Sequence, residues 1–216
     1  MFVQIKFNQV NNTRHLFILL ALYFLHVGKI RINCDFIFID EAQDYSDIEY
    51  RLLRGVHGKN TIIELYGDCM QKITPNRGID NWNQIQSLFG NEYYELKENY
   101  RNTVEIANYI NDHIKNVFTT IGLHGEEVHK IGKNWNQSVS QELQEHPEER
   151  IAVICKDKNI ILDDKANFVL KTNVYTVVEA KGLEFDSVYV INKGMTNNEK
   201  YIAYSRALKV LNIVQE

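Results

Sequence analysis

Two neighbouring carboxylates, Asp40 and Glu41, directly follow the apolar run of residues 36–39. Such a run predicts a buried parallel strand, and ligands of open α/β sheets bind at the carboxyl ends of the strands. In nucleotide-hydrolysing folds, an aspartate at this place holds Mg²⁺ and the glutamate beside it can orient a water molecule. The two residues therefore indicate a site for a nucleotide and its metal ion.

The second part expected of such a site is a glycine-rich loop, G-x-x-x-x-G-K-[ST], whose backbone amides cradle the phosphates. The 216 residues contain no match, because the Gly-Lys pairs at positions 28–29 and 58–59 are followed by Ile30 and Asn60. The sequence thus has the metal-binding part of the pattern without the phosphate-binding part.

Further side chains suited to nucleotide chemistry lie downstream, each next to a predicted strand or helix. They are Gln71, Tyr100, Arg101, Glu184 and Arg206. Guanidinium groups suit a transferring phosphoryl group because they are planar, permanently charged and able to donate two aligned hydrogen bonds. For either arginine alone, half of a surface ion pair is an alternative interpretation. The order of the surrounding motifs is what favours a shared site.

The elements that would position these side chains alternate between strands and helices. Strands are predicted at residues 2–7, 36–39, 61–66, 92–96, 151–155, 174–178, 188–191 and 210–214, and helices at 47–56, 103–117 and 199–209. The strands are short apolar or alternating runs, and the helix at 103–117 places apolar residues three or four positions apart. This alternation predicts an α/β fold, and a boundary near residues 96–100 divides it into two sheets.

The composition indicates a folded cytoplasmic protein without a membrane segment. The net charge of −4 does not favour a nucleic-acid binder, although a local groove could still be basic. Three widely spaced cysteines, Cys34, Cys69 and Cys155, predict reduced thiols. The apolar run at residues 16–27 is too short to span a bilayer, so we expect a buried helix there.

The motifs, taken in order, resemble motifs II to VI of the UvrD/Rep-type superfamily 1 DNA helicases. They are Asp40-Glu41-Ala42-Gln43-Asp44, Gly67-Asp68-x-x-Gln71, Asn99-Tyr100-Arg101, Ala180-Lys181-Gly182-Leu183-Glu184-Phe185 and Tyr201-Ile202-Ala203-x-Ser205-Arg206-Ala207. Within that family, Tyr45-Ser46, Trp82 and Leu183-Glu184-Phe185-Asp186 resemble the helicase IV and HelD-like branch.

The resemblance implies an α/β fold of two RecA-like, P-loop NTPase-type parallel sheets flanked by helices, the first of them incomplete. Residues 1–96 would form a partial first domain with motifs II and III, and residues 97–216 the second domain with motifs IV, V and VI. The implied cofactors are ATP and Mg²⁺. By the resemblance, Asp40 with Glu41 beside it holds the metal ion, and Glu41 activates the attacking water. Gln71 would sense the γ-phosphate, Tyr100 stack on adenine, Glu184 contact the ribose, and Arg101 and Arg206 reach the γ-phosphate.

The largest departure from the family lies ahead of the carboxylates. The family's phosphate-binding loop lies well upstream of this motif, and only 39 residues precede Asp40, so the chain resembles a family member that begins partway through its first domain. Hydrogen bonds to charged groups contribute about 1.5–3 kcal/mol each, so losing three would weaken ATP binding roughly a thousandfold. The chain alone is therefore expected to be a very poor ATPase.

A second departure concerns the grip on nucleic acid. Thr74 and Asn76 stand where the family commonly has two aromatic residues that stack on single-stranded bases, and Val178 stands where many relatives have histidine. Each stacking contact contributes about 1–3 kcal/mol. Binding of single-stranded or duplex DNA by the family's usual route is therefore expected to be weakened.

Three functions are consistent with these residues. The first is a fragment of an ATP-dependent DNA helicase or translocase, as in DNA repair, whose phosphate-binding half comes from a longer or a second chain. The second is a non-catalytic, helicase-derived protein that binds a partner such as RNA polymerase or a DNA-repair complex. The third is a metal-dependent nuclease built on Asp40, Glu41, Asp44 and Asp68, which leaves the arginines without a purpose.

Overall fold

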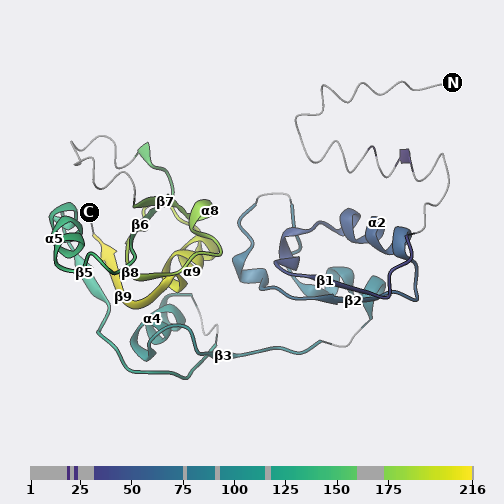
Figure 1. Ribbon diagram of the computed structural model, residues 1–216, viewed down its shortest axis with the longest axis horizontal. Helices are drawn as coiled ribbons and strands as arrows, with labels where there is room; N and C mark the ends of the chain where they lie inside the picture. The colour runs from purple at the N-terminus through teal and green to yellow at the C-terminus, as the bar shows by residue number, and fades with distance from the viewer. Residues whose placement is uncertain are drawn as a thin grey trace. The chain divides into compact units, whose positions relative to one another are not determined.

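The computed structural model describes residues 19, 22, 23, 32–74, 77–90, 93–114, 118–159 and 173–215. The chain divides into two compact units, unit 1 (Met1–Tyr93) and unit 2 (Tyr94–Glu216), whose elements are labelled in Figure 1. The strand predicted at residues 2–7 lies outside the described residues, as does most of the run 16–27, of which Leu19, Leu22 and Tyr23 are helical. In the described part of the chain, no helix combines the length and the apolar character needed to cross a bilayer.

Unit 1 is built around two parallel strands, β1 (Phe36–Ile39) and β2 (Ile62–Leu65). Helix α2 (Asp47–His57) connects them, and the Glu49 carboxylate accepts a hydrogen bond from the Ser46 backbone N–H at 2.7 Å where this helix begins. The short helical turns η2 (Ala42–Asp44), η3 (Cys69–Gln71) and η4 (Trp82–Ile85) and helix α3 (Gln86–Phe89) complete the unit. Both η2 and η3 lie just beyond the carboxyl ends of the strands, where the sequence predicts a site.

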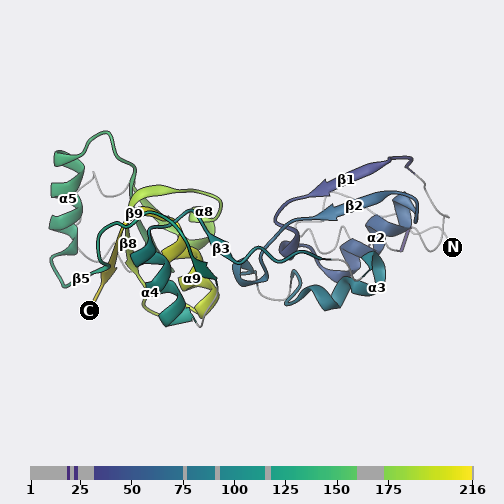
Figure 2. The same ribbon diagram turned by 90° about the horizontal axis from the view of Figure 1, so that it is seen from below.

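The core of unit 1 lies on one side of β1 and β2. Figure 2 shows α2 and α3 on that side. The buried side chains of Ala42, Tyr50, Ile79 and Ile85 pack together there, and Tyr50 meets the ring of Phe89 edge-on at a centroid distance of 5.4 Å. Apolar burial of this kind contributes about 25 cal/mol per Å² to stability. Because Ala42 in η2 and Ile85 in η4 belong to the cluster, its burial also stabilises the positions of these turns.

We define the outer face of unit 1 as the side chains of Phe36, Phe38 and Ile62. These residues are 55%, 65% and 51% exposed, respectively. The prediction that residues 36–39 form a buried strand is therefore wrong for the described structure, in which Ile37 and Ile39 are only partly buried. The physical reason is that the described helices α2 and α3 cover only the opposite side of the sheet. The rings of Phe36 and Phe38 stack on each other instead, with their centroids 6.5 Å apart.

Unit 2 contains a five-stranded parallel sheet in the order β5-β9-β8-β6-β7. The strands are β5 (His129–Ile131), β6 (Ile151–Cys155), β7 (Val174–Thr176), β8 (Phe185–Ile191) and β9 (Ala207–Val214). The helices are α4 (Val104–Ile114), α5 (Trp135–Glu145), α8 (Val177–Ala180) and α9 (Asn197–Ser205). A separate two-residue pair, β3 (Glu98–Asn99) with β4 (Thr119–Thr120), precedes the sheet in the sequence.

The sheet of unit 2 is covered by helices on both faces. Helix α5 packs on one face through Trp135 and Val139, which belong to the same buried cluster as Val153. Helices α4 and α9 lie side by side on the other face (Figures 1 and 2), where the rings of Tyr109 and Tyr204 meet at 5.6 Å. All five residues of β6 are consequently buried, as expected for a parallel strand between two helical layers. The α/β fold with parallel sheets flanked by helices is confirmed.

One predicted strand is absent. Residues 93–97 form no regular structure, and Tyr93 and Tyr94 are 68% and 96% exposed. The alternating pattern at 92–96 predicts a strand, but pairing begins only at Glu98, which lies opposite Thr119. A strand needs a neighbour to satisfy its backbone groups, and the described residues provide one only at Lys97, whose carbonyl accepts from the Thr119 N–H at 2.5 Å.

Candidate functional site

The carboxylates of unit 1 follow β1 at its carboxyl end. Asp40 is exposed, and its Oδ1 accepts a hydrogen bond from the Glu41 backbone N–H at 2.8 Å. Glu41 adopts a left-handed conformation with φ of 50°, and it is the one residue other than glycine with positive φ among the described residues. Left-handed backbone strains an L-residue by about 1–2 kcal/mol, and such strain gathers at functional sites.

A buried amide connects Glu41 to the next loop. The side chain of Gln43 is completely buried, donates from Nε2 to Glu41 Oε2 at 2.5 Å, and accepts from the Asp68 backbone N–H at 3.0 Å. The Asp68 carboxylate in turn accepts from Gln71 Nε2 at 3.1 Å. A continuous hydrogen-bonded series, Glu41–Gln43–Asp68–Gln71, therefore joins the ends of β1 and β2.

Two glycines make room for this amide. A Cβ at Gly67 would lie 2.2 Å from Gln43 Oε1, and a Cβ at Gly78 would lie 2.3 Å from the Gln43 carbonyl oxygen. Gly78 also has φ of +83°, a conformation that side chains rarely adopt. The backbone of Gln43 is held as well, because its carbonyl accepts from the Ile79 N–H at 2.9 Å.

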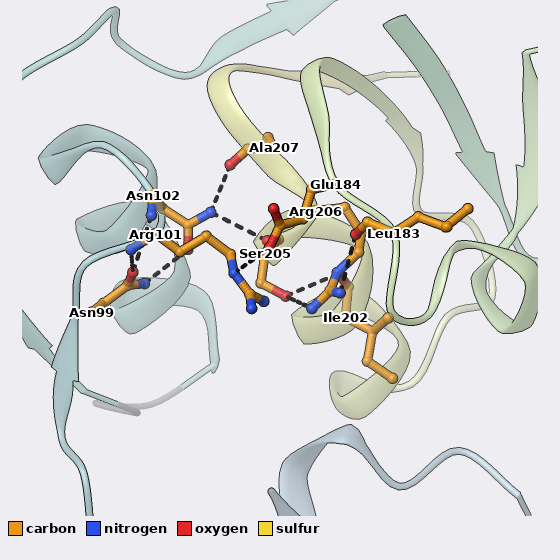
Figure 3. Close-up of polar contacts among 9 residues, drawn as sticks. All are labelled: Asn99, Arg101, Asn102, Leu183, Glu184, Ile202, Ser205, Arg206 and Ala207. Carbon is orange, nitrogen blue, oxygen red and sulfur yellow. Dashed lines mark hydrogen bonds and ion pairs between the residues drawn. The ribbon is translucent and has the colours of Figure 1, made fainter. Parts of the chain in front are cut away.

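The predicted nucleotide contacts of unit 2 begin with a turn that follows β3. Asn99 Oδ1 accepts from the backbone N–H groups of Arg101 at 2.9 Å and Asn102 at 3.1 Å, which fixes the turn. Tyr100 stands on this turn with 73% of its surface exposed, as a stacking side chain requires. Arg101 Nε lies 2.8 Å from Glu184 Oε1, so two residues predicted to touch the nucleotide form an ion pair with each other (Figure 3).

Arg206 lies in the same region of unit 2 but is only 2% exposed. Its guanidinium donates to the carbonyl oxygens of Ile202 at 3.1 Å and Leu183 at 3.2 Å and to Ser205 Oγ at 3.0 Å (Figure 3). These acceptors lie at the end of α9 and in the loop before β8. In this conformation, Arg206 therefore ties together two of the three motif-bearing segments of unit 2, residues 180–185 and 201–207.

The structure thus forms two groups of the predicted residues. Unit 1 holds Asp40, Glu41 and Gln71 near one another, and unit 2 holds Arg101, Glu184 and Arg206. Of the positions where the family has stacking or histidine side chains, Thr74 is exposed and Asn76 lies outside the described residues, while Val178 on α8 is 70% exposed.

The donors for a metal ion are few in unit 1. No group of three or more His, Cys, Asp or Glu side chains capable of holding a metal ion occurs among the described residues. Mg²⁺, however, is usually held through one or two carboxylates and keeps several of its waters. The exposed carboxylate of Asp40 with Glu41 next to it fits that requirement. Cys69 in the neighbouring turn is not a suitable ligand, since burial raises the pKa of its thiol to about 11.

Sequence reasoning missed two residues that organise these groups, Gln43 and Asn102. Both are buried amides, 0% and 3% exposed. The only signal for Gln43 is its place inside the motif Asp40 to Asp44, and the only signal for Asn102 is its place directly before the helix predicted at 103–117. Their partners are distant in the sequence, so their roles require the folded chain.

Comparisons with known proteins indicate the family of the chain. The family model described as viral superfamily 1 RNA helicase core domain matches residues 23–215. DNA helicase II of Haemophilus influenzae is 34% identical over 88 residues, which cover 40% of this chain and 12% of that protein.

Among solved structures, the Arterivirus nonstructural protein 10 helicase in complex with DNA has a TM-score of 0.55 and 18% identity, over 88% of this chain and 41% of that one. The PRRSV helicase has a TM-score of 0.52 and 14% identity, over 82% of this chain and 34% of that one. The chain therefore spans less than half the length of each of these relatives. Because the family model covers most of the chain, the protein belongs to the superfamily 1 helicase core-domain family.

Proposed function

We propose that this chain is part of an ATP-driven nucleic-acid motor, a helicase or translocase whose ATP hydrolysis depends on nucleic acid. The observation that carries the proposal is the hydrogen-bonded series from Glu41 through Gln43 and Asp68 to Gln71. It connects a candidate water-activating carboxylate with a candidate γ-phosphate sensor through a buried, satisfied amide. Such a series suits an enzyme in which the state of the nucleotide must be communicated to another loop.

The proposed ligands are ATP and Mg²⁺. Asp40, with Glu41 beside it, would hold the metal ion, which neutralises charge on the phosphates, and Glu41 would accept a proton from the attacking water. The exposed ring of Tyr100 would stack on adenine, and Glu184 would contact the ribose. Arg101 and Arg206 would donate to the phosphoryl oxygens as charge develops. Arg101 can do so after leaving Glu184, whereas Arg206 must first exchange its present backbone acceptors.

The phosphate cradle is proposed to come from residues other than these 216. The sequence contains no G-x-x-x-x-G-K-[ST] loop, and the loss of about three charged hydrogen bonds weakens binding roughly a thousandfold. A longer chain or a second polypeptide would restore them. Hydrolysis by this chain alone is accordingly expected to be very slow.

Nucleic acid is the proposed polymer substrate. The similar Arterivirus helicase is described in complex with DNA, and the partial relative is a DNA helicase. We propose single-stranded or duplex DNA for this chain and a cytoplasmic role in DNA repair. Binding would be weaker than in relatives with two stacking aromatics, because exposed Thr74 occupies one of those places.

A titration with Mg²⁺ and ATP, followed by NMR on the full chain, tests the nucleotide site. The Tyr100 ring and the Arg101 Nε–Hε signal should shift at millimolar ATP. Arg101→Ala should weaken ATP binding, so that the Tyr100 shift needs a higher ATP concentration, because the arginine anchors the phosphates. Lys97→Ala is the matched control, since its side chain is also an exposed cation paired with a nearby carboxylate, Glu95, at 3.1 Å. Equal shifts in both variants, or none in the unmodified chain, would contradict the proposed site.

A further inference from the structure

Asn102 places a buried amide between two segments of unit 2 that are far apart in the sequence. Its Nδ2 donates to the carbonyl oxygens of Ala207 at 2.6 Å and Ser205 at 3.3 Å, and its Oδ1 accepts from Asn99 Nδ2 at 2.8 Å (Figure 3). Only 3% of the residue is exposed. Both donors and the acceptor of the amide are therefore used inside the protein.

The partners of this amide flank the two arginines. Asn102 directly follows Arg101, while Ser205 and Ala207 lie on either side of Arg206. Figure 3 shows the amide between the two segments, with the guanidinium groups on the side of Glu184 and Leu183. One side chain thus joins the backbone that carries the first arginine to the backbone that carries the second.

A simple role in starting helix α4 does not account for this geometry. The backbone of Thr103, the residue between Asn102 and the helix, accepts from the Ala107 N–H at 2.9 Å, and its Oγ1 lies 3.4 Å from the Ile106 N. Thr103 therefore serves the first turn. The amide of Asn102 points away from that turn, toward the start of β9.

We propose that Asn102 is a positioning residue, which holds Arg101 and Tyr100 at a fixed place relative to Arg206. The proposal rests on the proposed nucleotide site. The new element of the proposal is that Arg101 and Arg206 act together, because a buried amide couples their backbones. Buried polar groups that are fully satisfied make a local structure rigid, and a binding site loses efficiency when its support loosens.

The test compares Asn102→Ala with Asn111→Ala in the full chain. Asn111 is the matched control, because its amide also bridges helix α4 to another segment, donating to the Phe118 carbonyl at 2.7 Å and accepting from the Phe118 N–H at 3.1 Å. The ligand-free readout is the heteronuclear NOE of the Arg101 Nε–Hε pair, which reports whether its ion pair with Glu184 is ordered. We expect this NOE to fall in Asn102→Ala and to stay unchanged in Asn111→Ala.

A conservative variant separates positioning from general loss of structure. In Asn102→Asp, the ionised carboxylate faces two carbonyl oxygens, whereas the protonated acid can donate one hydrogen bond to Ala207. Burial raises the pKa of such a carboxyl, so lowering the pH from about 8 to about 5 should restore the Arg101 NOE in Asn102→Asp but not in Asn102→Ala. This variant also keeps the test decisive if Asn102→Ala does not fold.

Nucleotide binding supplies the second readout. With Mg²⁺ and ATP, Asn102→Ala should weaken binding roughly tenfold in the unmodified background and clearly less in Arg101→Ala, because a large part of its action passes through that arginine. Additive losses, or an Arg101 NOE that is unchanged in Asn102→Ala, would overturn the proposal. Absence of ATP binding by the unmodified chain would instead contradict the proposed function, and the ligand-free NOE would still decide the role of Asn102.

Discussion

Gly67 illustrates how closely the chain is packed around Gln43 in the hydrogen-bonded series of unit 1. A Cβ there would lie 2.2 Å from Gln43 Oε1 and 3.0 Å from the Ala42 backbone nitrogen. We expect Gly67→Ala to destabilise unit 1 by about 1–3 kcal/mol, because a buried amide must move and lose its partners. The free energy of unfolding from urea denaturation checks this expectation.

Gly55 provides the control for that substitution. It lies inside α2, and a methyl group added there would have no neighbouring atom within 4 Å, so Gly55→Ala should be neutral or stabilise by about 0.5–1 kcal/mol. An equal decrease in the free energy of unfolding for the two variants would show that the effect of Gly67→Ala does not come from a clash with Gln43.

At the residue scale, the sequence singles out candidate side chains by their chemistry. Carboxylates after a strand and arginines in order, such as Asp40 and Arg206, stand out because phosphoryl transfer uses such groups, and their roles stay predictions. Amides are less informative, since Asn and Gln are common on surfaces. The roles of Gln43 and Asn102 depend on partners that folding brings to them, in one case 103 residues away. The burial of Arg206 was missed for the same reason.

At the scale of single elements, the short helix α8 depends on its first turn. The side chain of Thr176 accepts from the Glu179 N–H while the Glu179 carboxylate accepts from the Thr176 N–H. Lys158 and these hydrogen bonds lower the pKa of Glu179 to about 2. Because the pKa is lower in the folded chain than in the unfolded one, this stabilisation is present above about pH 4.5 and is lost as the pH falls toward 2.

Removal of the lysine should reverse part of that shift. In Lys158→Ala, the carboxyl of Glu179 should titrate closer to its usual pKa, because the positively charged partner that lowers this pKa is gone. An NMR titration of the Glu179 side-chain carbonyl measures this directly. Lys133→Ala, which removes an exposed lysine elsewhere in unit 2, should leave the titration unchanged; a similar change in both variants would assign the shift to net charge.

Element boundaries were predicted less well than element types. The helix expected at 199–209 ends at Ser205, and β9 begins at Ala207. Helical spacing in the sequence continues past that point, but pairing with β8, where Phe185 lies opposite Ala207, gives the backbone of these residues partners in the sheet. Similarly, β7 ends at Thr176 because the capping hydrogen bonds start a helix there. A tertiary partner overrode local preference at the end of α9, whereas a local capping box ended β7.

At the scale of the whole molecule, each unit has its own core and one cysteine whose thiol pKa is raised. Burial raises the pKa of Cys69 in unit 1 and of Cys155 in unit 2 to about 11, whereas Cys34 is exposed. Alkylation of the buried Cys155 therefore requires opening of unit 2, whereas the partly buried Cys69 should react slowly until unit 1 opens. The division at 96/97 into two RecA-like domains remains a prediction that this behaviour can test.

Pulsed alkylation across a urea series, read by peptide mass spectrometry, should show Cys34 modified throughout. Cys69 should become reactive at a lower urea concentration than Cys155, because unit 1 has the smaller described core while β6 is buried at every position. Coincident transitions for Cys69 and Cys155 would mean that the chain unfolds as one cooperative body.

The outer face of unit 1 has a consequence for the lifetime of the chain in a cell. Three large apolar side chains, Phe36, Phe38 and Ile62, are each more than half exposed in the described structure. Chaperones and proteases select proteins by exposed apolar surface of this kind. The abundance of the chain should therefore rise when that face is covered, whether or not nucleotide is bound. Phe38→Thr should lengthen the half-life of the chain and leave the carboxylates of Asp40 and Glu41 in place.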